Sequence, residues 1–148
     1  MIRFRAAGEA DVGAVVGLLT DDVLGAARER QDAAAYLQAF RQMQAEGNNH
    51  LIVGEHAGRI VATYQITFIA GLSLGAARRA QVESVRVASD LRGQGIGALL
   101  MADAEQRACA AGCRLIQLTT NRSRTEAHRF YERLGFTASH IGYKRQLA

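Results

Sequence analysis

The apolar positions in the first third of the chain follow the period of an amphipathic helix twice. Four aliphatic residues within residues 9–20 occupy the i, i+3, i+4 and i+7 positions of one helix face. Residues 32–46 repeat that period, begin with Asp32 as an N-cap and end where Gly47 breaks the pattern. The N-terminal region is therefore predicted to contain two helices.

Short runs of β-branched and aromatic residues predict the strands. The predicted strands are residues 2–6, 51–53, 60–68, 80–87, 114–119, 136–138 and 141–146. Residues 56–59 read as a tight turn, and residues 69–79, rich in alanine and glycine, read as a loop.

Two further helices are predicted in the second half. A glycine-rich turn at residues 92–97 leads into a helix of about 15 residues that stops at Gly112 as a C′ glycine. A second helix spans residues 124–134, and Ser123 and Glu126 have the spacing of a capping box at its start.

The predicted elements follow the order β-α-α-β-β-β-α-β-α-β-β, and no linker or internal repeat interrupts them. This order predicts an α/β fold in a single domain over residues 1–148, with a central mixed β-sheet flanked by helices. The early strands are expected to be antiparallel, and a parallel pair is expected around the helix at residues 98–111.

Composition narrows the class of protein. The 148 residues carry a net charge of +4, and 49% of them are hydrophobic, which suits one globular domain. The arginines are scattered without aromatic interleaving, which argues against nucleic acid as a partner. No apolar run is long enough to span a membrane and no signal-peptide core is visible, so we expect a cytoplasmic protein without a membrane partner.

Cys109 and Cys113 lack further ligands for a metal site and are predicted to be small buried apolar residues.

The turn from Arg92 to Gly97 is the most informative stretch. Glycine permits a backbone turn with amides directed inward, and these amides, a helix N-terminus and Arg92 suit a pyrophosphate. Ala98 stands where a Walker motif needs lysine, and the glycine spacing differs from that of a dinucleotide-binding fold. A tight turn without a ligand is the remaining alternative.

Two motifs resemble those of one enzyme superfamily. Arg92, Gly95 and Gly97 match the Gln/Arg-x-x-Gly-x-Gly/Ala acetyl-coenzyme A signature of the GNAT superfamily of N-acetyltransferases, and the predicted element order is similar over nearly the whole chain. Residues 121–136 resemble the second cofactor motif of that superfamily. The C-terminal third is also similar to bacterial aminoalkylphosphonate N-acetyltransferases.

The resemblance implies acetyl-coenzyme A (acetyl-CoA) as co-substrate and a set of residues that contact it. Some act through their backbone on the pantetheine arm, and others hold the pyrophosphate. These residues are Val85, Arg86, Val87, Arg92, Gly93, Gln94, Gly95, Ile96, Gly97, Asn121 and His128. No metal is expected.

The resemblance also assigns chemistry. Tyr131 would protonate the departing thiolate, and Glu83 would accept the proton of the attacking ammonium, directly or through water. A backbone amide near Val85 would stabilise the developing oxyanion, so no covalent nucleophile is required. Tyr64 and Gln65 are candidate contacts for the acceptor.

The predicted function is therefore acetyl transfer from acetyl-CoA to the primary amine of a small molecule. A protein or peptide acetyltransferase and a non-catalytic acyl-CoA-binding regulatory module are the alternatives. Residues 20–35 and 69–79 should set the acceptor, but neither has a pattern that names it. The resemblance also implies a homodimer.

Overall fold

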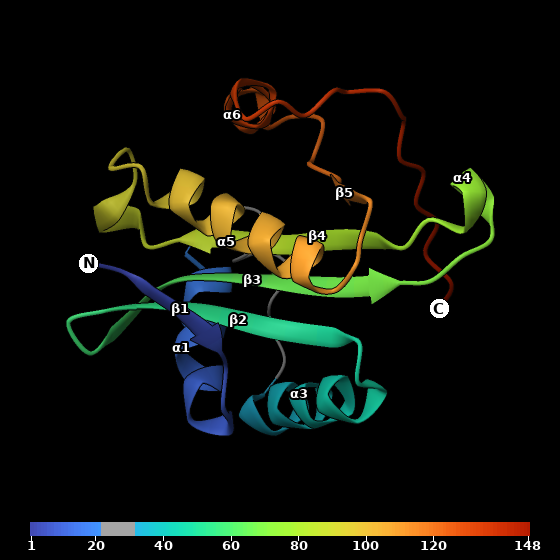
Figure 1. The fold of residues 1–148 in the computed structure, drawn as a ribbon. Coiled ribbons are helices and arrows are strands. Elements are labelled where there is room, and N and C mark those ends of the chain that lie inside the picture. Colours follow the sequence, from blue (N-terminus) through green and yellow to red (C-terminus); the bar gives the residue numbers. More distant parts are fainter. Residues whose placement is uncertain (22–31) are drawn as a thin grey trace. The chain divides into compact units, whose positions relative to one another are not determined.

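The computed structural model describes residues 1–21 and 32–148 (Figure 1). Their contacts divide the chain into two compact units, Met1–Gln117 and Leu118–Ala148.

A five-stranded sheet forms the centre of the first unit. Its strands lie in the order β1-β2-β3-β4-β5, and β1 to β4 are antiparallel neighbours. Their bounds are β1 (Arg3–Ala6), β2 (Asn49–His56), β3 (Arg59–Ile69), β4 (Arg79–Val87) and β5 (Leu115–Leu118). Strand β5 comes next to β4 after the crossover through a helix, and the predicted α/β class with a mixed sheet is confirmed.

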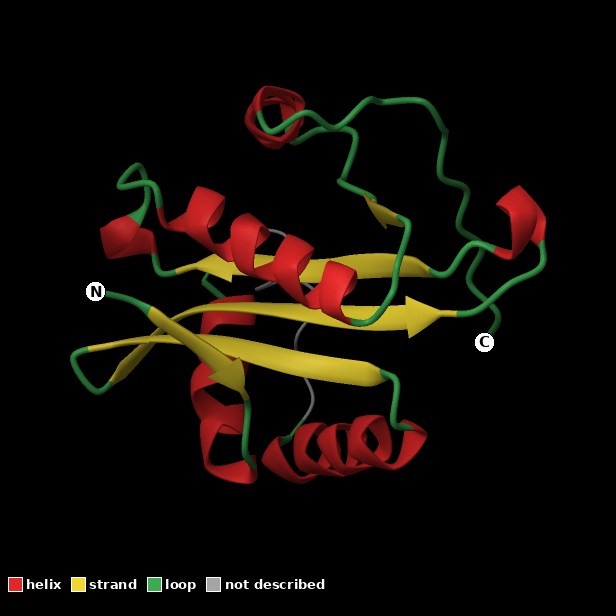
Figure 2. Cartoon of the chain, in the orientation of Figure 1, coloured by secondary structure: helices red, strands yellow, loops and turns green. Residues whose placement is uncertain are grey.

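Helices cover both faces of this sheet. In Figure 2, α1 and α3 lie on one side and α5 on the other, in agreement with the strands that each helix contacts. The longer helices of the first unit are α1 (Val12–Leu19), α3 (Ala33–Glu46) and α5 (Ile96–Ala110). Two 3₁₀ turns, η1 (Glu9–Asp11) and η2 (Ser89–Leu91), and the short α4 (Ser73–Ala76) complete it.

The helix boundaries follow the signals in the sequence. The carboxylate of Asp32 accepts a hydrogen bond from the Ala35 amide at 2.9 Å, so Asp32 is the predicted N-cap of α3. Gly47 and Gly112 have φ angles of 85° and 77° at the ends of α3 and α5. Such left-handed angles favour glycine, which explains why both helices stop there.

One part of the core of the first unit lies between α5 and the middle of the sheet, and another lies under α1 around Leu18 and Val61. Tyr64 and Ile66 on β3 are fully buried, as is Leu100 on α5. Leu100, Ala104 and Ala108 form the buried stripe of α5, one residue per turn. Among the described residues no helix has the length and apolar character needed to cross a bilayer.

Three predictions about local structure are wrong. Cys109 is exposed and Cys113 only half-buried, because the buried stripe of α5 passes through Ala104 and Ala108 instead. The predicted loop at residues 69–79 contains α4, and its last residue, Arg79, is the first residue of β4.

The C-terminal unit departs further from prediction. Its helix α6 (Thr125–Arg133) has Arg124 as N-cap without a side-chain hydrogen bond, so Ser123 and Glu126 do not form the predicted capping box. Residues 136–138 and 141–146 are not strands, because strand formation needs a paired neighbour that this segment lacks in the described structure.

Candidate functional site

Strand β4 contains a β-bulge at its centre. Thr63 pairs with Arg86 and Gln65 pairs with Glu83, so the two residues Ser84 and Val85 lie opposite the single residue Tyr64. Ser84 has a φ of 54°, a left-handed angle that is uncommon outside glycine. A bulge takes one residue out of regular pairing and bends the strand.

The bulge marks the part of β4 that was predicted to hold the pantetheine arm. Val85, Arg86 and Val87 are half-buried, and an Arg86 Nη1 donates a hydrogen bond to the Val85 carbonyl at 2.9 Å. Backbone that leaves the regular ladder can turn its amides toward a ligand. The geometry therefore suits the predicted backbone role of this stretch.

Gln65 and Glu83 lie side by side on one face of the sheet. They are direct cross-strand partners, and such partners point to the same side. Tyr64 points to the opposite side, toward α5, because successive side chains of a strand alternate. Glu83 and the candidate acceptor contact Gln65 thus share the face that α1 and α3 cover.

Glu83 is exposed on β4. Gln65 is held more firmly, since its Nε2 donates to Asn49 Oδ1 at 2.8 Å. Thr67 Oγ1 donates to the same oxygen at 3.3 Å. The orientation of the Gln65 amide beside the carboxylate is therefore defined by β2.

The glycine turn has the predicted geometry. Gly93 and Gly95 have φ angles of 78° and 81°, and α5 begins immediately afterwards at Ile96. A Cβ built on either glycine would meet no protein atom within 4 Å. The first-turn amides of a helix have no acceptor within the helix, and this makes a helix N-terminus such as that of α5 a source of donors for an anion.

Acidic residues fix the backbone that leads into this turn. Arg59 at the start of β3 makes two hydrogen bonds of 2.9 Å to Asp90 in η2. The hydrogen bonds from Arg59 keep the pKa of Asp90 below its usual value. Asp21 accepts a hydrogen bond from the Ser89 amide at 3.1 Å and lies 3.9 Å from Arg92 Nη2. The Arg92 side chain is half-exposed and available for a phosphate.

Tyr64 lies in the core. Its side chain is fully buried, and its hydroxyl donates to Asp103 Oδ2 on α5 at 2.5 Å. Arg107, one turn further along α5, donates from Nε to the same oxygen at 2.8 Å. This placement does not support the predicted contact of Tyr64 with an acceptor.

The other predicted site residues lie in the C-terminal unit. Tyr131 on α6 is half-buried and packs edge-to-face against Phe130 and Phe136, with ring centroids 5.1 and 5.8 Å apart. His128 Nε2 lies 3.0 Å from the Asn121 carbonyl oxygen. The three predicted residues of this unit therefore sit in an ordered helix and its preceding loop.

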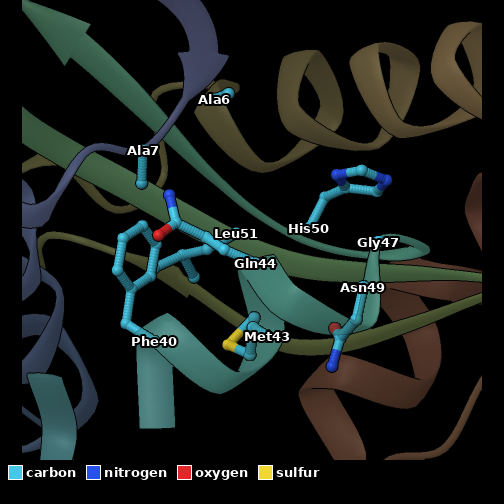
Figure 3. Close-up of a pocket in the computed structure, with 9 residues that line it drawn as sticks. All are labelled: Ala6, Ala7, Phe40, Met43, Gln44, Gly47, Asn49, His50 and Leu51. Carbon is cyan, nitrogen blue, oxygen red and sulfur yellow. The ribbon is translucent and has the colours of Figure 1, made fainter. Parts of the chain in front are cut away.

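A separate cavity of about 190 Å³ lies between α3, the end of β1 and the start of β2 (Figure 3). Phe40 and Met43 line its α3 side, while Asn49 and His50 line its β2 side. Strand β3 separates β1 and β2 from β4, so this cavity is distinct from the region around the glycine turn that follows β4.

Several residues of the site were not predicted from the sequence. Ser84 gives no signal, because serine is common in strands and turns alike. Asp103 and Arg107 stand at i and i+4 of a predicted helix, which is the spacing of an ion pair. That signal was available, but nothing in the sequence connects this pair with Tyr64.

The chain belongs to the acetyltransferase (GNAT) family, whose family model matches residues 15–136. The fold and the glycine turn described above agree with this assignment, and the acetyltransferase class predicted from the sequence is confirmed.

Individual relatives place the chain within that family. An aminoalkylphosphonate N-acetyltransferase of Salmonella typhimurium is 42% identical over 67 residues, which make up 45% of this chain and 44% of that protein. The match thus spans less than half of that relative's length. A solved structure from Bacillus halodurans C-125, described as a transcriptional regulator, is 44% identical over 99% of this chain and 100% of its own, with a TM-score of 0.95. A protein of Agrobacterium tumefaciens assigned as an acetyltransferase is 27% identical over 98% of this chain and 99% of its own, with a TM-score of 0.87.

Proposed function

We propose that this protein transfers the acetyl group of acetyl-CoA to the primary amine of a small molecule by direct attack. The observation that carries the proposal is the bulge at Ser84 and Val85, followed within the same unit by the glycine turn. One feature offers backbone amides at a bent strand, and the other offers the N-terminus of a helix.

The glycine turn suits the pyrophosphate of acetyl-CoA. Gly93 and Gly95 leave room for a close approach of phosphate to the backbone, and the N-terminus of α5 favours negative charge. Arg92 adds a guanidinium that can pair with a phosphate oxygen. Gln94, Ile96 and Gly97 contribute through their backbone amides.

The bulge suits the thioester end. The backbone of Val85 to Val87 would bind the amide-rich arm as an added strand, and an amide at the bulge would donate to the thioester oxygen as negative charge develops there. Acetyl-CoA supplies the activated acetyl group, and the amine attacks its carbonyl carbon.

Two side chains would move protons. An alkyl ammonium is protonated at neutral pH and must lose a proton before it attacks, and Glu83 would accept that proton directly or through water. Gln65, fixed by Asn49 beside Glu83, would contact the acceptor. Tyr131 would donate a proton to the departing thiolate, and Asn121 and His128 would contact the cofactor.

A small amine is the preferred acceptor class because the relative of S. typhimurium is named for aminoalkylphosphonates. A protein or peptide acceptor is the alternative within the class. A third candidate is a regulatory module that binds acyl-CoA without turnover, because the B. halodurans relative is described as a transcriptional regulator. The segment at residues 20–35, expected to help set the acceptor, lies largely outside the described residues. We further propose a cytoplasmic homodimer that binds neither nucleic acid nor membrane.

The test is titration calorimetry with acetyl-CoA, followed by a thiol-release screen. The panel contains aminoalkylphosphonates, polyamines, amino acids, aminoglycosides and a lysine peptide. Binding together with release for a small amine supports the proposal, and Glu83→Gln should lower that release roughly 10²-fold. Release with the lysine peptide alone would favour the protein acceptor. Binding without any release would favour the regulatory module, and absence of binding would overturn the proposal.

A further inference from the structure

A buried hydrogen-bond network crosses from β3 through α5 to β1. Tyr64 on β3 donates to Asp103, which also accepts from Arg107 on the same helix. Arg107 Nη2 in turn donates to the Phe4 carbonyl oxygen of β1 at 3.4 Å. The Asp103 side chain is 19% exposed, so its charge is largely withdrawn from water and compensated by these two donors.

The two ends of the Tyr64–Asp103 bond belong to the two halves of the proposed acetyl-CoA site. Tyr64 is the residue that lies opposite the bulge at Ser84 and Val85. Asp103 is carried by α5, whose N-terminus follows Gly95 and forms the glycine turn. The bond therefore joins the strand region that would hold the thioester end to the helix that would hold the pyrophosphate.

The hydrogen bond between Tyr64 and Asp103 can fix the position of α5 along the sheet, which apolar packing alone does not do. Burial of aliphatic side chains is non-directional and permits a helix to slide by a small amount along a sheet. A hydrogen bond between fixed atoms specifies one position, and buried polar groups are best attested in this registering role. Burial raises the pKa of Tyr64, and the charge of Asp103 adds to the effect, so the phenol remains a donor at neutral pH.

We propose that Tyr64 is a positioning residue that, through Asp103, sets the distance between the bulge of β4 and the N-terminus of α5. This inference rests on the proposed function, since it assumes that one acetyl-CoA molecule spans both places. Tyr64 acts without touching the ligand. Its loss should leave each half of the site intact and disturb only their spacing.

The test compares a ligand that spans both halves with ligands that occupy one. Acetyl-CoA spans them, adenosine 3′-phosphate 5′-diphosphate carries only the phosphate end, and S-acetylpantetheine carries only the thioester end. In the full-length protein, Tyr64→Phe should weaken acetyl-CoA binding about tenfold and change the affinity for each fragment less than about twofold, because only the linkage between the halves is disturbed. Titration calorimetry measures all three.

Thr63→Val is the matched control. Thr63 is buried next to Tyr64 on β3 and donates one hydrogen bond, to the Ile52 carbonyl oxygen at 2.8 Å, and strand alternation places its side chain on the face opposite to that of Tyr64. This variant also loses one buried hydroxyl, so its thermal unfolding shows the cost of that loss alone. It should bind acetyl-CoA like the wild type.

Asp103→Asn gives a second route if Tyr64→Phe does not fold, and it should show the same contrast between spanning ligand and fragments. Equal weakening of acetyl-CoA and the fragments, no weakening at all, or the same loss in Thr63→Val would overturn the inference. A wild-type protein that does not bind acetyl-CoA would instead overturn the proposed function on which the inference rests.

Discussion

Arg59 and Asp90 form a bidentate ion pair in which both nitrogens Nη1 and Nη2 meet carboxylate oxygens at 2.9 Å. The pair connects the first residue of β3 with η2, directly ahead of the glycine turn. Both side chains are more than half exposed, so the pair contributes to the placement of the turn rather than to the stability of the protein.

Arg59→Ala should therefore weaken acetyl-CoA binding while the melting temperature stays nearly constant. We expect a roughly three- to tenfold loss of affinity for acetyl-CoA, because a displaced glycine turn weakens binding even when the fold is intact. Arg41→Ala is the control, since it removes another exposed pair, with Glu9 at 2.7 Å, on α3. Calorimetry that shows equal losses for the two variants would contradict this assignment.

Gly95→Ala should reduce both stability and affinity. An L-residue at a φ of 81° costs about 1–2 kcal/mol, and its Cβ would enter the open space assigned to the phosphate. Gly58→Ala is matched, because Gly58 has a φ of 77° and equally open surroundings in the turn between β2 and β3. Both variants should lose similar stability in denaturant titrations, but only Gly95→Ala should lose more than about tenfold in acetyl-CoA affinity.

Tyr131→Phe should lower kcat about 10²-fold. The ring contacts with Phe130 and Phe136 do not need the hydroxyl, whereas proton donation does. Tyr143→Phe removes a hydroxyl from a 90% exposed side chain of the same unit and should have wild-type kcat. Unchanged turnover in Tyr131→Phe would exclude the phenol as the acid.

Asp11 should make stability sensitive to acid. Hydrogen bonds from Arg5, at 2.7 and 3.0 Å, lower the pKa of Asp11 below its ordinary value. A carboxyl whose pKa is depressed by folding contributes stability above its unfolded pKa of about 3.9 and loses it as the pH falls through the folded pKa. Asp11→Asn should thus melt a few degrees below the wild type at pH 7.

That gap in melting temperature should close progressively below about pH 4, where the wild-type carboxyl takes up its proton. Thermal unfolding of both proteins between pH 7 and pH 3 measures it. A gap that is independent of pH would mean that the Asp11 contribution does not depend on its charge.

Much of the fold could be predicted because local signals and tertiary structure agree. Asp32, Gly47 and Gly112 mark helix ends through their own backbone preferences, which tertiary contacts do not change. The glycine turn was identified for the same reason, since left-handed angles at Gly93 and Gly95 require the residue type that the sequence shows.

Other features depend on contacts that the sequence pattern does not specify. Ser123 was expected to cap α6, but its hydroxyl bonds to Asn121 Oδ1 at 2.7 Å, and this local contact competes with the capping box. The burial of Tyr64 against α5 could not be predicted, because its partner Asp103 lies 39 positions away and no periodicity connects them. The positive φ of Ser84 likewise depends on pairing with β3.

The bulge has a further effect on how β4 tolerates changes in length. Before it, odd-numbered Glu83 shares a face with Gln65; after it, even-numbered Arg86 shares that same face through Thr63. Deletion of one residue at this point would remove the bulge and its bend, while Arg86 and Val87 would keep their present partners and faces in a regular ladder. The chain length between Glu83 and Arg86 thus determines whether β4 is bent at all, so deletion of Ser84 should leave the sheet paired and remove the bent backbone that the proposed function assigns to the thioester end.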